Sequence, residues 1–240
     1  MLRGIFVTGT DTGVGKSIVA AVIARLAASA GLKTGVMKPV ASGCILRDGV
    51  RISEDAELLT HGAGKTSLLP EVTPYLLIAP LAPSVAAAKE GVRIDLEKIA
   101  TAYAILASAN DFMVVEGVGG LMVPLAGGLL VADLIRRLDL PVIVVARPGL
   151  GTVNHTLLTC LAARQMGITV IGVIISGFPD EPDEASASAP HLIGSLSGAP
   201  LLGIFPRIDA ADPRHVVDAV VARIATDPLT TLLRKELGIV

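Results

Sequence analysis

The stretch that most constrains the fold lies near the start of the chain, where a short apolar run leads into a glycine-rich segment. Ile5–Val7 has the pattern of a buried strand, and Ile18–Ala24, apolar nearly all round, predicts a buried helix. Between them lies Gly9–Ser17, with the sequence GTDTGVGKS. Small residues let backbone N–H groups approach a polyphosphate, and a helix N-terminus adds unpaired donors and partial positive charge. The stretch therefore predicts a nucleoside triphosphate site between a strand and a helix.

The spacing of this loop departs from the usual G-x-x-x-x-G-K-[ST] pattern. Counting back from Gly15 puts Thr10 at the first position, and the glycine stands one residue earlier, at Gly9. In a phosphate loop, Lys16 would reach the β and γ oxygens and the Ser17 hydroxyl could bind Mg²⁺. The alternative is a glycine-rich turn with a chance Lys-Ser pair. The strand before it and the helix after it favour the phosphate loop.

Composition narrows the class of protein. Hydrophobic residues make up 52% of the 240 residues and the mean hydropathy is +0.68, yet no apolar run reaches the ~18 residues of a membrane span. The net charge of −2, without a basic stripe, argues against a nucleic-acid partner. Cys44 and Cys160 are typical of buried thiols in a reducing compartment. We therefore expect a cytoplasmic protein with neither a nucleic-acid nor a membrane partner.

Six short apolar runs recur along the chain, separated by stretches of helical character. They are continuous rather than alternating, as in strands buried on both faces of a parallel sheet. The predicted strands are 5–7, 34–38, 112–115, 141–146, 170–175 and 201–205, and the predicted helices are 18–24, 53–60, 84–90, 95–108, 132–138, 153–165, 187–196 and 215–225. This alternation predicts an α/β fold with a doubly wound, mostly parallel sheet flanked by helices, of the P-loop NTPase type.

Two segments fit this alternation poorly. Residues 41–90 consist mainly of short polar pieces punctuated by proline, and residues 177–190 are acidic and proline-rich, which predicts a surface loop. No linker or internal repeat divides the chain. We therefore expect a single nucleotide-binding domain over residues 1–240.

Ligands of doubly wound sheets bind beyond the carboxyl ends of the strands, so residues that end each run are candidates. Glu116 ends the most buried run, where a carboxylate typically holds Mg²⁺, and the following glycines resemble a segment that contacts a γ-phosphate. Lys38 could neutralise a transferring phosphoryl group, although a surface lysine is an equally good interpretation. Asp55 is typical of a helix's first turn, and His155 of a helix start. Ser42 alone is only a turn serine.

Four segments together resemble the dethiobiotin synthetase family: Gly9–Ser17, Lys38–Gly43 (KPVASG), Val115–Gly120 (VEGVGG) and Leu150–His155 (LGTVNH). The second and fourth motifs are much more specific than the phosphate loop, and their order and spacing match across nearly the whole chain. The resemblance implies an ATP- and Mg²⁺-dependent cyclo-ligase of biotin biosynthesis. Such an enzyme converts 7,8-diaminopelargonate and CO2 into dethiobiotin, with release of ADP and phosphate.

The resemblance also implies roles for individual residues. Lys38, Lys16 and Thr12 would be catalytic, and Ser17, Asp55 and Glu116 would hold Mg²⁺. The nucleotide would contact Gly13, Val14, Gly15, Lys16, Ser17, Asp55, Glu116, Gly117, Val118, Gly119, Ser176, Gly177, Pro206, Arg207 and Ile208. The small-molecule substrate would contact Thr12, Lys38, Ser42, Leu150, Gly151, Thr152, Val153 and Asn154. In this family the last five come from the partner subunit, which implies a homodimer with active sites at the interface.

Two positions depart from the family pattern. Gly13 stands where several relatives carry an acidic residue, so any role of that carboxylate is absent here. Ser176-Gly177 replaces an Asn-Asp pair that reads adenine in some relatives. A hydroxyl reads a purine edge less well than an amide, which donates and accepts together. We therefore expect looser selectivity for the nucleotide base.

Two other classes of protein remain as alternatives. ATP-binding domains of the cobyrinate-amidase type share a similar loop but accompany a catalytic cysteine, and neither Cys44 nor Cys160 lies in such a context. ParA/MinD-like ATPase switches usually carry a lysine early in the loop, and Thr10–Val14 has none.

Overall fold

The computed structural model describes residues 4–66 and 68–239, and its centre is a six-stranded sheet in the order β12-β11-β10-β1-β7-β2. Each strand runs parallel to its neighbours. The strands are β1 (Gly4–Gly9), β2 (Thr34–Met37), β7 (Phe112–Gly120), β10 (Val142–Ala146), β11 (Val170–Phe178) and β12 (Leu201–Pro206). All six strands expected from the apolar runs are present, which confirms the doubly wound α/β fold.

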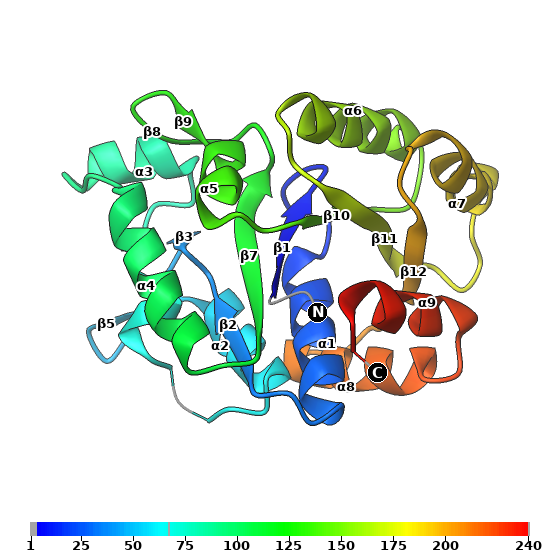
Figure 1. Cartoon of the computed structure of the whole chain (residues 1–240), viewed down its shortest axis with the longest axis horizontal. Helices are drawn as coiled ribbons and strands as arrows, with labels where there is room; N and C mark the ends of the chain where they lie inside the picture. The colour runs from blue at the N-terminus through cyan, green and yellow to red at the C-terminus, as the bar shows by residue number, and fades with distance from the viewer. Residues whose placement is uncertain (1–3, 67, 240) are drawn as a thin grey trace.

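Helices cover both faces of this sheet (Figure 1). On one face α1 (Lys16–Ser29) packs against β1, β2 and β7, with α2 (Glu54–Gly62) and α8 (Pro213–Ile224) beside it, while α9 (Pro228–Leu237) packs against β12. Right-handed crossovers put the helices that precede β7, β10, β11 and β12 on the other face. These are α4 (Leu96–Ser108), α5 (Val131–Leu138), α6 (Thr152–Gln165) and α7 (Glu184–Leu196).

The apolar runs are buried because the sheet is covered on both sides. Every residue of β1 and of β10 is buried, and α1 is buried along most of its length. The packed core includes Phe6, Phe112 and Phe205, and it extends along the chain from Ile5 to Ile239. Both cysteine thiols are buried and unpaired, as expected.

Smaller elements occupy the part of the chain that the sequence left irregular. Parallel β3 (Val40–Ser42) and β6 (Tyr75–Leu77) form a pair, and antiparallel β4 (Ile45–Arg47) and β5 (Val50–Ile52) form a hairpin. A 3-10 turn, η1 (Pro70–Val72), and the short helix α3 (Pro83–Lys89) accompany them. A second hairpin, β8 (Pro124–Ala126) with β9 (Leu129–Leu130), lies against α3.

The predicted surface loop at residues 177–190 is wrong in its second half, because α7 begins at Glu184 and contains Pro190. The Asp183 carboxylate accepts a hydrogen bond of 2.7 Å from the Ser186 N–H and caps the helix. Ser186 and Ala189 are buried, so the helix gains packing that offsets the N–H missing at Pro190.

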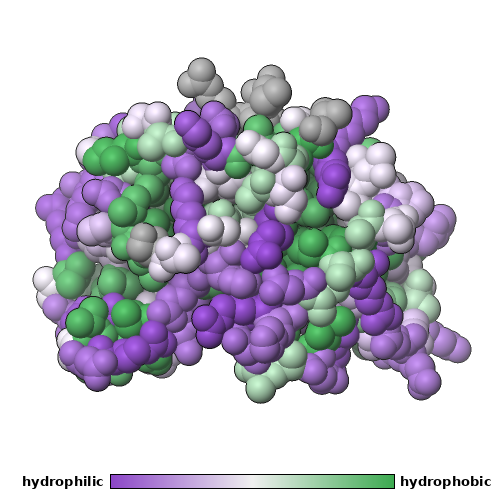
Figure 2. Space-filling model, turned by 90° about the horizontal axis from the view of Figure 1, so that it is seen from below, coloured by the Kyte–Doolittle hydropathy of each residue, from purple (hydrophilic) through white to green (hydrophobic). Residues whose placement is uncertain are grey.

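In the described part of the chain no helix is long and apolar enough to cross a membrane. Figure 2 views the molecule from below, at the edge of the sheet opposite the loop between β1 and α1, and hydrophilic side chains cover most of this face. The positive mean hydropathy therefore reflects the buried sheet and α1 rather than this face.

Candidate nucleotide and metal site

The loop between β1 and α1 leaves backbone donors free at the start of a buried helix. Gly15 is the N-cap of α1, and no side chain caps this helix, so its first N–H groups remain available to an anion. Gly13 and Gly15 have φ angles of +74° and +90°, a backbone conformation that residues with a Cβ rarely adopt. A Cβ at Gly15 would also lie 2.5 Å from Ser176 Oγ. Only glycine therefore allows this loop to lie against the end of β11.

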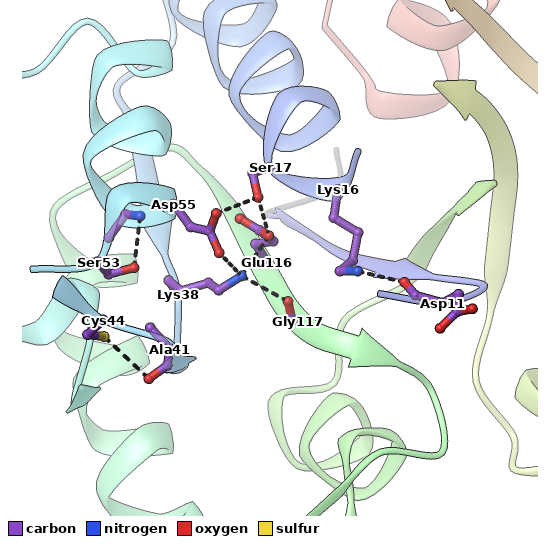
Figure 3. Close-up of polar contacts among 11 residues, drawn as sticks. Asp11, Lys16, Ser17, Lys38, Ala41, Cys44, Ser53, Asp55, Glu116 and Gly117 are labelled. Atoms are coloured by element: carbon purple, nitrogen blue, oxygen red, sulfur yellow. Dashed lines mark hydrogen bonds and ion pairs between the residues drawn. The ribbon is translucent and has the colours of Figure 1, made fainter. Parts of the chain in front are cut away.

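Lys16 is held inside the loop. Its side chain is buried, and its Nζ donates a hydrogen bond of 2.9 Å to the Asp11 carbonyl (Figure 3). Burial lowers the pKa of Lys16, while the Glu116 carboxylate acts in the opposite direction without fully compensating. A phosphate bound by the loop would supply the negative charge that this ammonium lacks.

Four side chains from separate segments meet beside the loop (Figure 3). The Ser17 hydroxyl lies 2.8 Å from Asp55 Oδ1 and 2.8 Å from Glu116 Oε1. Lys38 Nζ lies 2.8 Å from Asp55 Oδ2, 2.7 Å from Glu116 Oε1 and 3.2 Å from the Gly117 carbonyl oxygen. Ser17 lies in α1, Lys38 directly follows β2, Asp55 lies in the first turn of α2 and Glu116 lies in β7. We call this group the Lys38 cluster.

Burial strengthens the electrostatic interactions within the Lys38 cluster and shifts the pKa values of its members. The side chains of Lys38 and Glu116 are only 4% and 1% exposed, whereas that of Asp55 is 45% exposed. Burial raises the pKa of Glu116, and Lys38 offsets this only in part. The pKa of Lys38 is also raised, because the Glu116 and Asp55 carboxylates together outweigh its burial. Burial acts to raise the pKa of Asp55, but Lys38 and Ser17 lower it overall.

The Lys38 cluster has spare capacity to bind a cation. Two carboxylates face one ammonium, which leaves a formal charge of about −1. Glu116 Oε2 is buried without a hydrogen-bond partner, an expensive arrangement for a carboxylate oxygen. Nowhere in residues 4–66 and 68–239 do three His, Cys, Asp or Glu side chains gather in a metal-binding group. Two carboxylates and a hydroxyl are nevertheless the hard oxygen donors that suit Mg²⁺, which usually completes its shell with phosphate and water.

The end of β7 passes close to the phosphate loop. A Cβ at Gly117 would lie 2.7 Å from Phe6 Cε1, so only glycine fits against the buried Phe6 ring there. Gly119 has a φ of +63°, and a Cβ built on it would lie 3.5 Å from Thr12 Oγ1. The predicted γ-phosphate segment and Thr12 are therefore brought together.

The other predicted contacts lie at or near the ends of β3, β11 and β12, of which β3 belongs to a separate two-stranded sheet. Ser42 ends β3, and Ser176–Gly177 lies near the end of β11. Pro206 ends β12, and the following Arg207 N–H donates a hydrogen bond of 2.8 Å to the Phe178 carbonyl oxygen. The ends of β11 and β12 lie at the same edge of the main sheet as the phosphate loop, and the roles of these residues as nucleotide or substrate contacts stay a prediction.

The predicted substrate segment Leu150–Asn154 lies apart from the Lys38 cluster, at the start of α6. Gly151, with a φ of +88°, is the N-cap, and no side chain caps the helix. Thr152 is buried and its Oγ1 has no hydrogen-bond partner, whereas Leu150 is 85% exposed. The described structure contains no hydrogen bond between this segment and Lys16, Ser17, Lys38, Asp55 or Glu116.

The sequence did not reveal that Lys38 pairs with both carboxylates. Position alone left it divided between a phosphoryl contact and a surface lysine, and Asp55 resembled an ordinary first-turn acid. A weak signal was present, because Lys38 follows a predicted strand, Asp55 begins a predicted helix and Glu116 ends a predicted apolar run, although in the structure β7 continues past Glu116 to Gly120.

A parallel sheet in this order, with a glycine-rich loop and a buried lysine at the start of α1, defines a P-loop nucleotide-binding protein. Solved structures share this fold. A ParA family ATPase from Chlorobium tepidum superposes with a TM-score of 0.55 at 17% identity, covering 99% of this chain and 98% of that one. The septum site-determining protein MinD complexed with Mg-ADP from Pyrococcus horikoshii gives 0.54 at 18% identity, covering 100% and 94%. At this identity the likeness shows the fold alone.

Sequence comparison identifies the family. A protein-family model described as an AAA domain matches residues 3–215. The ATP-dependent dethiobiotin synthetase BioD of Bacillus licheniformis is 41% identical over 215 residues, which cover 90% of each chain. That of Thermodesulfovibrio yellowstonii is 40% identical over 240 residues, covering 97% of this chain and 100% of its own. The chain belongs to the ATP-dependent dethiobiotin synthetase family, whose members are ligases that form carbon–nitrogen bonds.

Proposed function

We propose that this protein closes the ureido ring of dethiobiotin from 7,8-diaminopelargonate and CO2. One amine of the diamine attacks CO2, loses a proton and becomes a carbamate. A carbamate oxygen then attacks the γ-phosphorus of ATP, and ADP leaves. The second amine attacks the carbonyl carbon of the resulting mixed anhydride, a proton is lost and phosphate departs. Such a reaction needs two anions held in contact and their charge neutralised, rather than a covalent intermediate on the protein.

In this proposal the loop from Gly13 to Ser17 wraps the phosphates of ATP. The uncapped N-terminus of α1 supports this, because free N–H groups and the helix dipole both favour an anion. Lys16 reaches the β and γ oxygens. Burial lowers the pKa of Lys16, and a bound phosphate would provide the negative charge that stabilises its ammonium. Gly117, Val118 and Gly119 add backbone contacts to the γ-phosphate.

Mg²⁺ would be held by Ser17, Asp55 and Glu116, directly or through water. The unpartnered Glu116 Oε2 and the surplus negative charge of the Lys38 cluster support this assignment. When bound, the ion would neutralise the β and γ phosphates.

Lys38 is proposed to bind the carbamate and to stabilise the transferring phosphoryl group, with Thr12 and Ser42 holding the diamine. Its buried ammonium, already in contact with two carboxylates beside the phosphate loop, is the observation that carries the proposal. A fixed, poorly solvated positive charge stabilises developing negative charge more strongly than one in water.

The carboxylate of the diamine is proposed to bind at the N-terminus of α6 in a partner subunit, through backbone groups of Leu150–Val153 and the Asn154 side chain. The missing cap of α6 and the unpartnered Thr152 hydroxyl support an anion site. Leu150, Leu158 and Leu161 expose apolar surface on and before the same helix, which supports a homodimer through this face.

Ser176, Gly177 and Pro206–Ile208 are proposed to surround the nucleotide base, because Ser176 lies against Gly15 of the phosphate loop and β12 is the strand next to β11. We further propose that residues 1–240 act as one nucleotide-binding domain, supported by a core that continues from β1 to the residues after α9. Its use of ATP fits a cytoplasmic enzyme.

The proposal is tested by measuring phosphate release from ATP and Mg²⁺ with and without 7,8-diaminopelargonate and bicarbonate. We expect release that requires the diamine, that is lost in Lys38→Ala and that persists in Lys33→Ala, an exposed lysine at the opposite edge of the sheet. Release that is indifferent to the diamine would instead favour an ATPase switch.

A further inference from the structure

Glu90, the residue that follows α3, turns its carboxylate toward the loop after β6. Oε1 accepts hydrogen bonds from the N–H groups of Ile78, at 2.7 Å, and Ala79, at 3.2 Å. Only 14% of the Glu90 side chain is exposed. One carboxylate oxygen therefore fixes two consecutive peptide groups that have no strand partner for their N–H groups.

The same loop supports the segment that carries Ser42. In the parallel pair of β3 and β6, Ser42 stands opposite Leu77. Beyond it, the Gly43 N–H donates to the Ala79 carbonyl oxygen at 3.2 Å, and the Cys44 N–H donates to that of Leu77 at 2.9 Å. Ala79 thus links Glu90, through its N–H, to Gly43, through its carbonyl group. Ala41 and Cys44 flank Ser42–Gly43, and the Cys44 thiol donates to the Ala41 carbonyl oxygen at 3.5 Å (Figure 3).

Arg51, in β5, completes this connection. Its Nη1 lies 2.7 Å from Glu90 Oε2 and donates a second hydrogen bond of 2.7 Å to the Leu76 carbonyl oxygen. Partial burial would raise the pKa of Glu90, but the N–H groups of Ala79 and Ile78 together with Arg51 lower it overall. Glu90 is therefore ionised at neutral pH. It binds the N–H groups of Ile78 and Ala79 directly, and it holds the Leu76 carbonyl group through Arg51.

We propose that Glu90 is a positioning residue for the ligase reaction, which holds the Ser42 hydroxyl in place for the diamine through the loop 78–80. The proposal rests on the role of Ser42 in diamine binding given above. Loss of Glu90 would leave two backbone N–H groups without an acceptor and free Ala79 to move, and Gly43 with it. The expected consequence is weaker diamine binding, with the phosphate loop and ATP binding little changed.

The test is steady-state kinetics of Glu90→Ala, Ser42→Ala and the double variant, with diamine and ATP varied separately. We expect Glu90→Ala to raise the KM for the diamine about tenfold and to change the KM for ATP less than about twofold. Glu90→Gln retains an acceptor oxygen for both N–H groups and should restore most of the diamine KM, a rescue not expected if only the ion pair mattered. Glu97→Ala is the matched control, because it removes an exposed carboxylate paired with Arg137 at 2.6 Å.

The double variant decides whether Glu90 acts through Ser42. If it does, Glu90→Ala adds little to the diamine KM once Ser42 is alanine. A raised KM in Ser42→Ala with an unchanged KM in Glu90→Ala overturns the Glu90 proposal alone, as do fully additive effects. An unchanged KM in Ser42→Ala overturns the substrate role of Ser42 and the route through it. Should Glu90→Ala fail to fold, Glu90→Asp, which keeps the charge but shortens the reach to the Ile78 N–H, is judged by the same outcomes.

Discussion

Replacing Lys38 with methionine would leave two carboxylates in a buried cluster without their ammonium. The Glu116 side chain is only 1% exposed, so water cannot solvate its charge once the ammonium is gone, whereas Asp55, 45% exposed, stays in contact with water. Removing one partner of a buried ion pair typically costs about 3–5 kcal/mol. An independent bound comes from proton binding, which would neutralise Glu116. From its ordinary pKa of 4.5 to pH 8, at about 1.4 kcal/mol per pH unit, protonation costs about 5 kcal/mol. The two estimates agree.

Urea unfolding of nucleotide- and metal-free protein at pH 8 measures this loss. For a chain of this size, an m-value of about 3 kcal/mol/M converts 3–5 kcal/mol into a fall of about 1–1.7 M in the midpoint. The control is Glu97→Gln, which breaks the exposed pair with Arg137 and should leave the midpoint nearly unchanged. Addition of Mg²⁺ should stabilise Lys38→Met more than the parent protein, because the variant offers two uncompensated carboxylates.

The loss of stability in Lys38→Met should depend on pH, because it arises from the charge on Glu116. Without Lys38, the folded-state pKa of Glu116 lies further above its unfolded value. The group then binds more protons in the folded state, and stability is lost as pH rises from the unfolded value through the folded one. The deficit of Lys38→Met should therefore shrink to about 1–2 kcal/mol near pH 5.5. A loss below about 1 kcal/mol at pH 8, or one independent of pH, would refute the claim that Lys38 neutralises a buried charge.

Three further predictions concern catalysis and assembly. Lys16→Ala should lower turnover about 10²–10³-fold without unfolding the protein, because it removes one preorganised donor to the phosphates; steady-state rates together with a thermal melt check this, and near-normal turnover would contradict it. Leu158→Asp should dissociate the proposed homodimer and Ile105→Asp, at an exposed position of α4, should not; analytical ultracentrifugation distinguishes them, and a dimer that survives Leu158→Asp would exclude that part of α6 from the interface. Because Ser176 replaces an amide as the proposed base reader, ATP, CTP and GTP should support similar catalytic efficiencies; strict use of ATP would show that the base is read elsewhere.

The strands of the main sheet could be predicted because each is marked by a continuous run of apolar residues within one short stretch of sequence. Continuous apolar runs such as Val142–Ala146 can be stable only where both faces are covered, and the structure buries all five residues. The phosphate loop could also be predicted from the sequence. Gly13 and Gly15 adopt positive φ angles that few other residues tolerate, so the backbone conformation of the loop itself requires glycine at these positions. Where local signals compete, the sequence was less informative. Pro190 indicated a loop, but the Asp183 cap and the packing of Ala189 favour a helix.

The composition of the Lys38 cluster depended on contacts between distant segments. Ser17 and Glu116 are 99 positions apart, and Lys38 and Glu116 are 78 apart. Periodicity cannot indicate which strand ends become neighbours, because the order β1-β7-β2 differs from chain order. Glu90 gave no sequence signal at all. Its proposed role arises from the hydrogen bonds that its carboxylate accepts from the N–H groups of Ile78 and Ala79.

Ring closure by this protein is tested most directly by mass analysis of the product formed from 7,8-diaminopelargonate, ATP, Mg²⁺ and ¹³C-bicarbonate. We expect a cyclic urea that has gained one carbonyl group and lost two hydrogens relative to the diamine, with the ¹³C label in that carbonyl and one ADP formed per product. ATP hydrolysis without a labelled product, or a product that carries a phosphate and an open chain, would contradict ring closure by this enzyme.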